Sequence, residues 1–432
     1  MSGGSGMDGG PRSVIVVGAG IVGLSTAWFL QERGVDVTVI DRSGVAAGAS
    51  WGNAGWVSPA LTAPLNSPSV LREGLRAMAD PAAPLHIPVR ADAALARFLL
   101  RFAAHCRPGA WRQAVQANAA LNEEAIETFD VLVANGVDAP VTDTSLAVAF
   151  RDGGRADRFR TELDQLPPGS RPPHVEVLTG RALRLQVPLA SAQVAAIVNV
   201  SDQRFVDPGR FTHALAQSVT ERGATLRTGK VCTVSGTGAD ATVELRTGEA
   251  VRAGAVVLAT GAWLPALTGG RVRVGLQAGR GYSFTVPVDR PVPGPIYLPE
   301  ARVACTPYRN GLRVAGTMEF RRPSEPLAER RVEAIVASAT PLLDAVRWEQ
   351  RTDAWVGPRP VTDDGMPLIG QLAAGVYAAG GHGMWGLAHG PATGRLLAEQ
   401  IVTGKQPEAS RPFDPLRGRG RAARSEQLTL PL

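Results

Sequence analysis

Three glycines near the start of the chain restrict its fold more than any other feature. Gly18, Gly20 and Gly23 follow the apolar run 13–17 and precede an apolar segment that continues to Gly34. This order predicts a strand, a tight turn and a helix, in which the glycines let the backbone turn, approach a ligand and pack the helix against the strand. Free N–H groups at the N-terminus of such a helix bind phosphate. The N-terminal segment is therefore predicted to bind a dinucleotide.

An acidic residue follows where this motif requires one. Residues 35–41 predict a second strand that ends at Asp41, 18 residues after Gly23. A carboxylate at this place hydrogen-bonds ribose hydroxyls, whereas an arginine would accommodate a 2′-phosphate. We therefore expect a dinucleotide without a 2′-phosphate. A chance glycine turn is the alternative, and the strand, the helix and the acid together count against it.

The charged residues are mainly arginines. Of 45 basic residues, Lys230 and Lys405 are the two lysines, and the formal net charge is +6. Such a charge suits an anionic partner such as nucleic acid or a membrane surface. The arginines, however, are spread along the chain, with dense runs at 321–331 and 417–424 and no aromatic-basic recognition motif. We interpret them as a solvated surface and predict no nucleic-acid partner.

Length and cysteine usage narrow the class of protein further. A chain of 432 residues with 44% hydrophobic residues predicts two or three domains with a sizeable core. The three cysteines, Cys106, Cys232 and Cys305, are far apart and form no CxxC, which argues against a disulfide framework and a metal site. With no signal-peptide pattern and no apolar run of spanning length, we expect a cytoplasmic protein.

The predicted elements fall into two kinds of segment. Nucleotide-fold patterns occupy 13–65, 196–271 and 355–405, and they are separated by 66–195, which has mostly helical patterns, and 272–354, which alternates like an antiparallel sheet. We predict an α/β plus α+β architecture in which a discontinuous Rossmann domain is interleaved with a substrate domain built on the antiparallel sheet. Residues 1–12 and 406–432 are predicted to be flexible ends.

Four motifs carry a resemblance to a known family. Residues 46–59 read AAGASWGNAGWVSP, 281–283 read GYS, 357–367 read GPRPVTDDGMP, and 381–386 read GHGMWG. Their order and spacing over residues 13–403 resemble the D-amino-acid oxidase superfamily, in particular its D-amino-acid dehydrogenase branch. The resemblance implies a glutathione-reductase-type Rossmann domain that binds FAD.

The resemblance also implies which residues contact FAD. The positions that match the family's cofactor contacts are Gly18, Gly20, Ile21, Val22, Gly23, Asp41, Arg42, Ser50, Asn53, Ala54, Gly55, Val231, Thr260, Gly261, Trp263, Gly381, His382, Gly383 and Met384. The helix that begins after the second glycine cluster would direct its N–H groups to the place where negative charge develops on reduced flavin.

For the substrate, the resemblance points to Arg359. The arginine of this motif pairs with an amino-acid carboxylate, which the planar guanidinium can hold with two parallel hydrogen bonds. Tyr282 is a second candidate, as a hydroxyl donor to the same carboxylate, and Tyr308 and His382 complete the candidate catalytic set. Position 280 is arginine where the family pattern has lysine, so a role that needs that amine is not expected here.

The function implied is oxidation of an amino acid, in particular a D-amino acid, by hydride transfer to FAD, which yields an imino acid and then a 2-oxo acid. Sarcosine-oxidase-like relatives use a lysine above the flavin to react with oxygen, and neither Lys230 nor Lys405 is placed for that role. We therefore expect a dehydrogenase that passes electrons to a quinone or another carrier. The arginine-rich tail (Arg417, Arg419, Arg421 and Arg424) is a candidate for peripheral membrane contact. The alternatives are an oxygen-using oxidase of glycine, sarcosine or a proline-type imino acid, and a non-enzymatic basic binding protein.

Overall fold

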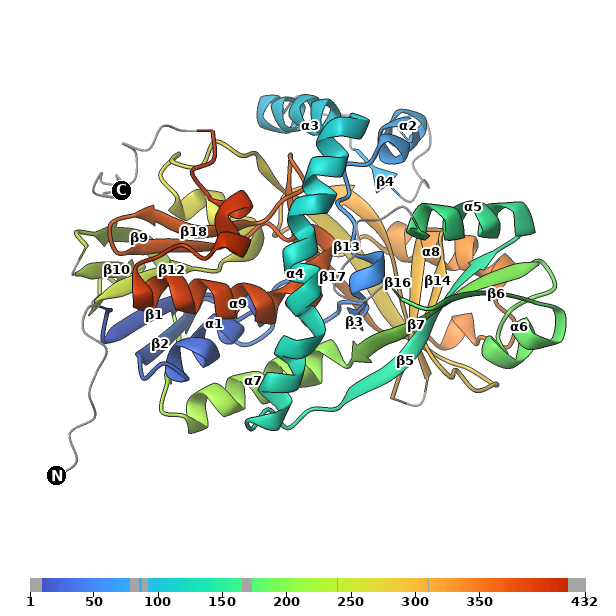
Figure 1. The fold of residues 1–432 in the computed structure, drawn as a ribbon, viewed down its shortest axis with the longest axis horizontal. Coiled ribbons are helices and arrows are strands. Elements are labelled where there is room, and N and C mark those ends of the chain that lie inside the picture. The colour runs from blue at the N-terminus through green and yellow to red at the C-terminus, as the bar shows by residue number, and fades with distance from the viewer. Residues whose placement is uncertain are drawn as a thin grey trace.

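A six-stranded sheet forms the centre of the nucleotide-binding half of the molecule (Figure 1). The computed structural model describes residues 10–77, 85–87, 92–164, 173–238, 240–309 and 311–418. The strands in spatial order are β18 (Leu368–Ala373), β19 (Val376–Gly380), β12 (Ala255–Leu258), β1 (Ser13–Val17), β2 (Asp36–Asp41) and β8 (Thr225–Thr228). They pair in parallel except for β18 with β19. The expected Rossmann-type sheet is present.

Three helices pack beside this sheet. They are α1 (Ile21–Gln31), α7 (Pro208–Glu221) and α9 (Gly386–Thr403). Trp28, Phe211 and Leu397, one from each helix, are fully buried in the same hydrophobic cluster as strand residues such as Val16. A small antiparallel sheet of β9 (Val231–Gly236), β10 (Ala241–Leu245) and β11 (Ala250–Ala253) is attached to it.

A ten-stranded, mainly antiparallel sheet forms the second half. Its strands are β3 (Trp56–Val57), β4 (Leu85–His86), β5 (Val141–Phe150), β6 (Val175–Thr179), β7 (Ala196–Val206), β13 (Leu276–Pro287), β14 (Ile296–Leu298), β15 (Val303–Tyr308), β16 (Gly311–Phe320) and β17 (Thr352–Thr362). The helices of this half are α2 (Pro68–Ala77), α3 (Ala93–His105), α4 (Pro108–Ala134), α5 (Gly153–Asp164), α6 (Gly180–Gln186) and α8 (Glu329–Ala339). The long helix α4 crosses α9 and so joins the two halves (Figure 1).

The structure differs from the predicted ranges at several places. β7 and β17 pair within the ten-stranded sheet, although most of their residues fall in ranges predicted as nucleotide-binding. Residues 66–195, predicted to be mostly helical, contribute the long strand β5 to the same sheet. These segments belong to the large sheet because they pair with strands far away in the sequence. A local sequence pattern does not reveal such pairing.

The predicted flexible end is wrong for the residues that the structure describes beyond 406. The 3-10 helix Glu408–Phe413 places Phe413 in the core with no exposed surface. Arg417 donates to both carboxylate oxygens of Asp364, at 2.7 and 2.9 Å. This arginine is therefore not available for the predicted membrane contact. Arg419, Arg421 and Arg424 lie outside the described residues.

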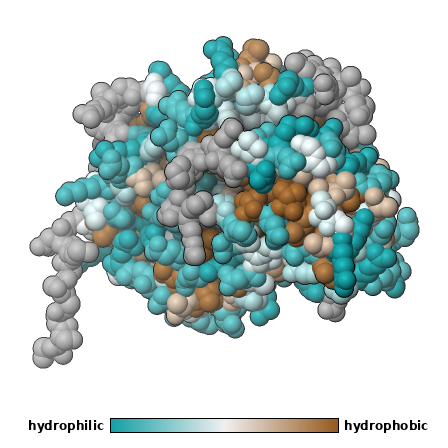
Figure 2. All heavy atoms as spheres, turned by 45° about the vertical axis from the view of Figure 1, so that its right-hand side comes forward, coloured by the Kyte–Doolittle hydropathy of each residue, from teal (hydrophilic) through white to brown (hydrophobic). Residues whose placement is uncertain are grey.

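The face shown in Figure 2 is mostly hydrophilic, with hydrophobic side chains in small patches. Among the described helices, none combines the length and the hydrophobicity needed to cross a membrane.

Candidate functional site

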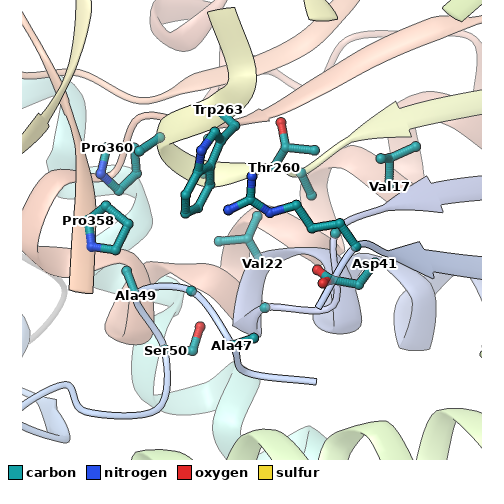
Figure 3. A pocket seen from close by; sticks show the side chains of 18 of the residues that line it. Val17, Val22, Asp41, Ala47, Ala49, Ser50, Thr260, Trp263, Pro358 and Pro360 are labelled. Carbon is teal, nitrogen blue, oxygen red and sulfur yellow. The ribbon is translucent and has the colours of Figure 1, made fainter. Parts of the chain in front are cut away.

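An elongated cavity of about 620 Å³ lies where the two halves of the molecule meet. Its lining comes from the β1–α1 turn, the end of β2, the loop 42–53, the β8–β9 turn, the 3-10 helix Gly261–Leu267, β17 and the start of α9. Figure 3 shows Asp41 on one side of the cavity and Pro358 and Pro360 on the other, with Trp263 between them. The cavity thus runs from the nucleotide fold to the large sheet.

The N-terminus of α1 opens on this cavity. Gly18 has a φ of +118°, and a Cβ there would lie 2.4 Å from the carbonyl oxygen of Ala259. At Gly23, a Cβ would lie 2.0 Å from the carbonyl oxygen of Gly18, so only glycine lets α1 pack this closely on β1. The first turn of α1 holds no acidic residue. Its N–H groups and helix dipole therefore offer a site for a pyrophosphate.

Asp41 ends β2 beside that turn. Its Oδ2 accepts a hydrogen bond from the backbone N–H of Ala19 at 2.9 Å, and its Oδ1 accepts from Ser43 and Gly44 at 2.7 and 3.0 Å. The carboxylate thus fixes the glycine turn and still lines the cavity. The neighbouring β8–β9 turn brings Lys230 and Val231 to the same end, because the backbone N–H of Gly229 donates to the carbonyl of Asp41.

Two side chains that follow the carboxyl ends of β2 and β12 meet beside the cavity. The Cζ of Arg42 lies 3.7 Å from the ring centroid of Trp263, which is a cation–π contact. Next to Trp263, the buried hydroxyl of Thr260 has no hydrogen-bond partner among the described residues. A buried hydroxyl without a partner is costly, and a polar group of a bound ligand would satisfy it.

A second helix N-terminus faces the far part of the cavity. Gly380, His382 and Gly383 line it, followed by Gly386 and Leu387 at the start of α9. The ring Nε2 of His382 lies 2.8 Å from Thr393 Oγ1, and burial lowers the pKa of His382 to about 4. The imidazole is therefore neutral at physiological pH, and the helix N-terminus contributes positive potential here without it.

Arg359 reaches into the same part of the cavity from β17. Its guanidinium lies across Gly281 of β13, where a Cβ would stand 2.0 Å from its Cζ. Nη1 donates to the carbonyl of Thr317 at 3.3 Å, and no described carboxylate forms an ion pair with it. Burial lowers the pKa of Arg359 to about 10, so the group stays charged at neutral pH. An unpaired guanidinium that lines a cavity is suited to binding an anion.

Tyr282 and Tyr308 do not occupy the positions predicted for them. Tyr282 is fully buried on the opposite face of the large sheet, and its hydroxyl donates to Glu319 Oε2 at 2.8 Å. Burial and this hydrogen bond raise the pKa of Tyr282 to about 12. Tyr308 packs under the guanidinium of Arg313, 4.2 Å from its Cζ. Neither tyrosine lines the cavity, so the prediction that they hold the substrate is not supported by the geometry.

The remaining predicted residues divide into two groups. Those that line the cavity are Gly18, Gly20, Ile21, Val22, Asp41, Arg42, Ser50, Asn53, Val231, Thr260, Gly261, Trp263, His382, Gly383 and Arg359. Those that do not line it are Gly23, Ala54, Gly55, Gly381 and Met384. Gly23 and Gly55 allow two backbone segments to pack closely. A Cβ at Gly55, for example, would lie 2.2 Å from the carbonyl oxygen of Val206. Met384 packs against a hydrophobic cluster around Phe98.

Sequence reasoning missed several lining residues. Ala47, Gly48 and Ala49 belong to a motif already recognised, and counting its whole length would have found them. Ser324 carried no signal, because it comes from the loop after β16. That loop is held by Arg280, whose Nη2 donates to the carbonyls of Glu325 and Pro326, both at 2.7 Å. The arginine that replaces the family's lysine thus anchors a wall of the cavity.

The cavity residues fit FAD. A turn that only glycine can form, two helix N-termini, a carboxylate at the second strand and an unpartnered Thr260 hydroxyl match the pyrophosphate, ribose and flavin ends of such a molecule. Fold and site together define a dinucleotide-dependent enzyme with the guanidinium of Arg359 in the same cavity. The sequence profile of the DAO family, described as FAD dependent oxidoreductase, matches residues 13–400, and the chain belongs to this family. FAD is accordingly its cofactor.

Individual relatives cover nearly the whole chain. The D-amino acid dehydrogenase of Cereibacter sphaeroides is 30% identical over 406 residues, which are 91% of this chain and 92% of the relative. That of a Methylobacterium species is 30% identical over 419 residues, or 91% and 96% of the two chains. A solved structure of glycine oxidase from Bacillus cereus superposes with a TM-score of 0.69, covering 95% of this chain and 99% of its own at 21% identity. This last likeness concerns the fold alone.

Proposed function

We propose that this FAD-dependent oxidoreductase oxidises an amino acid, in particular a D-amino acid, at its Cα–N bond. The observation that carries the proposal is Arg359, which has no counter-ion among the described residues and lines the cavity that also holds the FAD-binding turn. Its planar fork suits a carboxylate. The names of the relatives from Cereibacter and Methylobacterium support the same substrate class.

The protein's own contribution would be to bind the substrate and to orient it. Arg359 would hold the substrate carboxylate, which leaves the Cα–H and the amine to be directed inward by the cavity walls. FAD, when bound, supplies the hydride acceptor for this oxidation, and the imino acid then hydrolyses to a 2-oxo acid and ammonia. His382 is neutral and hydrogen-bonded to Thr393, so it adds no charge beside the amine, which would lose its ammonium proton to solvent before the Cα–H leaves as hydride. No side-chain acid–base pair is required.

The electron acceptor would be a quinone or another carrier. Lys230 lies at the Asp41 end of the cavity, away from Arg359, and Lys405 is exposed beyond α9. These are the two lysines of the chain. An ammonium group above the flavin, of the kind that promotes reaction with oxygen in sarcosine-oxidase-like relatives, thus has no source here. We place the enzyme in the cytoplasm, with peripheral contact to anionic lipid through the arginines beyond residue 418.

Anaerobic reduction tests the function directly. We expect the absorbance of the FAD-loaded protein to bleach with D-amino acids and to persist with their L-enantiomers. A panel with D- and L-alanine, glycine, sarcosine and both prolines separates the candidates. Bleaching by glycine, sarcosine or proline with peroxide formed in air would instead establish the oxidase alternative. If no amino acid bleaches the flavin, the proposed function is wrong.

A further inference from the structure

A second arginine in the large sheet has no counter-ion among the described residues. Arg313 of β16 is 1% exposed. Its Nη1 lies 3.4 Å from Ser283 Oγ, while Nε and Nη2 have no hydrogen-bond partner among the described residues. A guanidinium keeps its charge in proteins, and a buried charge without a partner is costly. Arg313 is therefore a candidate for binding an anion.

The surroundings of Arg313 do not neutralise it. The rings of Tyr308 and Trp51 lie 4.2 and 5.0 Å from its Cζ. Asp207 and Asp353 act on it only from beyond ion-pair distance. Asp207 is occupied as the cap of α7, where its Oδ1 accepts from the backbone N–H of Arg210 at 3.0 Å. Asp353 faces Arg309 at 3.9 Å.

Arg313 and Arg359 point from the same face of the sheet. Strand pairing places Arg359 opposite Gly279, and Arg313 opposite Thr285, on the two sides of β13. Gly279, Gly281, Ser283 and Thr285 alternate with Tyr282 and Phe284, which face the core beneath α8. Because alternate residues of a strand share a face, both arginines project away from that core.

The two guanidinium groups reach neighbouring positions of β13 on this face. That of Arg359 lies on Gly281, and that of Arg313 reaches Ser283. Positions two residues apart on a strand are separated by about 7 Å. The strands between the two groups carry the small residues Gly281, Ser283 and Ala315, and the ring of Trp355, which pairs with Ser283 from β17, packs over Gly357 beside them. The spacing suits a molecule with two carboxylates a few bonds apart.

We propose that Arg313 binds a second carboxylate, so that the substrate class is amino acids with an acidic side chain. This inference rests on the proposed function: Arg359 holds the α-carboxylate and Arg313 the side-chain carboxylate of the same molecule. The loop that carries Trp51 and Gly52 covers the path between them, since Ser283 Oγ donates to the carbonyl of Gly52 at 2.8 Å. Binding therefore requires Trp51 and Trp355 to move aside, because Gly52 packs on the Trp355 ring and Arg313 does not line the cavity.

The experiment compares acids with their isosteric amides. With FAD-loaded protein, we expect kcat/KM for D-aspartate to exceed that for D-asparagine at least ten-fold. In Arg313→Gln this ratio should fall by about 10- to 100-fold, the effect of a charge-assisted pair. Arg309→Gln is the matched control, because Arg309 is exposed and stacks on Tyr308 at 5.0 Å. It should preserve the ratio.

A binding measurement tests the inference without turnover, first on the wild-type protein and then on the variant. We expect calorimetric titration with malonate or succinate to give a dissociation constant at least ten-fold below that of acetate or propionate. Equal affinities, or a ratio unchanged by Arg313→Gln, would overturn the role of Arg313. Bleaching by D-alanine and D-asparagine but not by D-aspartate would leave the proposed function standing and refute only this inference. If no amino acid bleaches the flavin, the proposed function fails and the titration still decides on Arg313.

Discussion

At the scale of single residues, the site depends on charges that the fold leaves unpaired. Most buried charges in this protein have partners: Glu319, for example, accepts from Tyr282 and Arg321. Burial alone would raise the pKa of Glu319, but these hydrogen bonds and the charges of Arg321 and Arg331 hold it below its usual value. Among the described residues, the one hydrogen-bond partner of Arg359 is the backbone carbonyl of Thr317. This contrast is the reason for proposing Arg359, among 43 arginines, as the residue that binds the substrate.

Replacing Arg359 by glutamine should weaken substrate binding without releasing the cofactor. Loss of a charge-assisted pair costs about 1.5–3 kcal/mol, or roughly a 10- to 100-fold loss of kcat/KM, expressed mainly in KM. Steady-state kinetics and the flavin content of the purified variant check this. Arg160→Gln serves as control, since Arg160 is exposed on α5. Unchanged kinetics in Arg359→Gln would show that the carboxylate binds elsewhere.

Two buried histidines should make the fold sensitive to acid. Burial lowers the pKa of His382 to about 4, and burial together with the charge of His382 lowers that of His389 to about 3. Both pKa values lie below the value of about 6.5 in the unfolded chain. As the pH falls through 6.5, the unfolded chain therefore binds more protons than the folded protein. The contribution of these two neutral histidines to the free energy of unfolding is complete above pH 6.5 and decreases towards pH 4.

His389→Gln tests this dependence, because an amide can still donate to Asn122 Oδ1, which His389 Nε2 approaches at 2.7 Å. Between pH 6.5 and 5, wild-type protein should lose about 2 kcal/mol more of its free energy of unfolding than the variant. Urea denaturation at the two pH values measures the difference. Parallel losses in both proteins would mean that His389 is not buried in its neutral form.

At the scale of elements, the strand–turn–helix unit packs tightly because glycines stand at its points of closest contact. α1 contacts β1 at Gly23 and contacts α9 at Gly394, where a Cβ would lie 2.6 Å from the carbonyl carbon of Ser25. These close approaches position the N-terminus of α1 over the cavity. Cofactor binding and helix packing are thus consequences of the same glycines.

Gly23→Ala should therefore damage both properties. The added methyl group would meet the carbonyl oxygen of Gly18, and overpacking of this kind costs about 1–3 kcal/mol. We expect a lower urea midpoint and a reduced flavin-to-protein ratio after purification. Gly109→Ala is the matched control, because a Cβ at this position in the first turn of α4 meets nothing within 4 Å. Full flavin content in Gly23→Ala would contradict the packing argument.

At the scale of the whole molecule, the chain crosses between its two sheets repeatedly, and its C-terminal part closes the nucleotide-binding half. Phe413 belongs to the cluster that also contains residues of α1, α4 and α9. Arg417 ties the same segment to Asp364, which follows β17. The segment after α9 therefore stabilises both the helix layer and the strand that carries Arg359.

Truncating the side chain of Phe413 should destabilise the entire fold. Phe413→Ala leaves a cavity in a fully buried position and should reduce the free energy of unfolding by about 3–5 kcal/mol. Leu100→Ala, at a side chain that is 74% exposed, should change it by less than about 0.5 kcal/mol. Urea denaturation monitored by tryptophan fluorescence compares the two. A small effect at Phe413 would mean that this segment does not belong to the core.

The sequence alone determined the nucleotide-binding unit, because its signals are local. Gly18, Gly23 and Asp41 are separated by fixed spacings that follow from one strand, one turn and one helix. Arg359 could likewise be recognised within a short motif. The tertiary structure decided everything that depends on which strands pair and which face a side chain takes. It turned Tyr282 towards Glu319 and brought Ser324 to the cavity, and it put Arg313 and Arg359 on the same face of the large sheet, on the two sides of β13. Long-range pairing sets these contacts, and no local pattern encodes it.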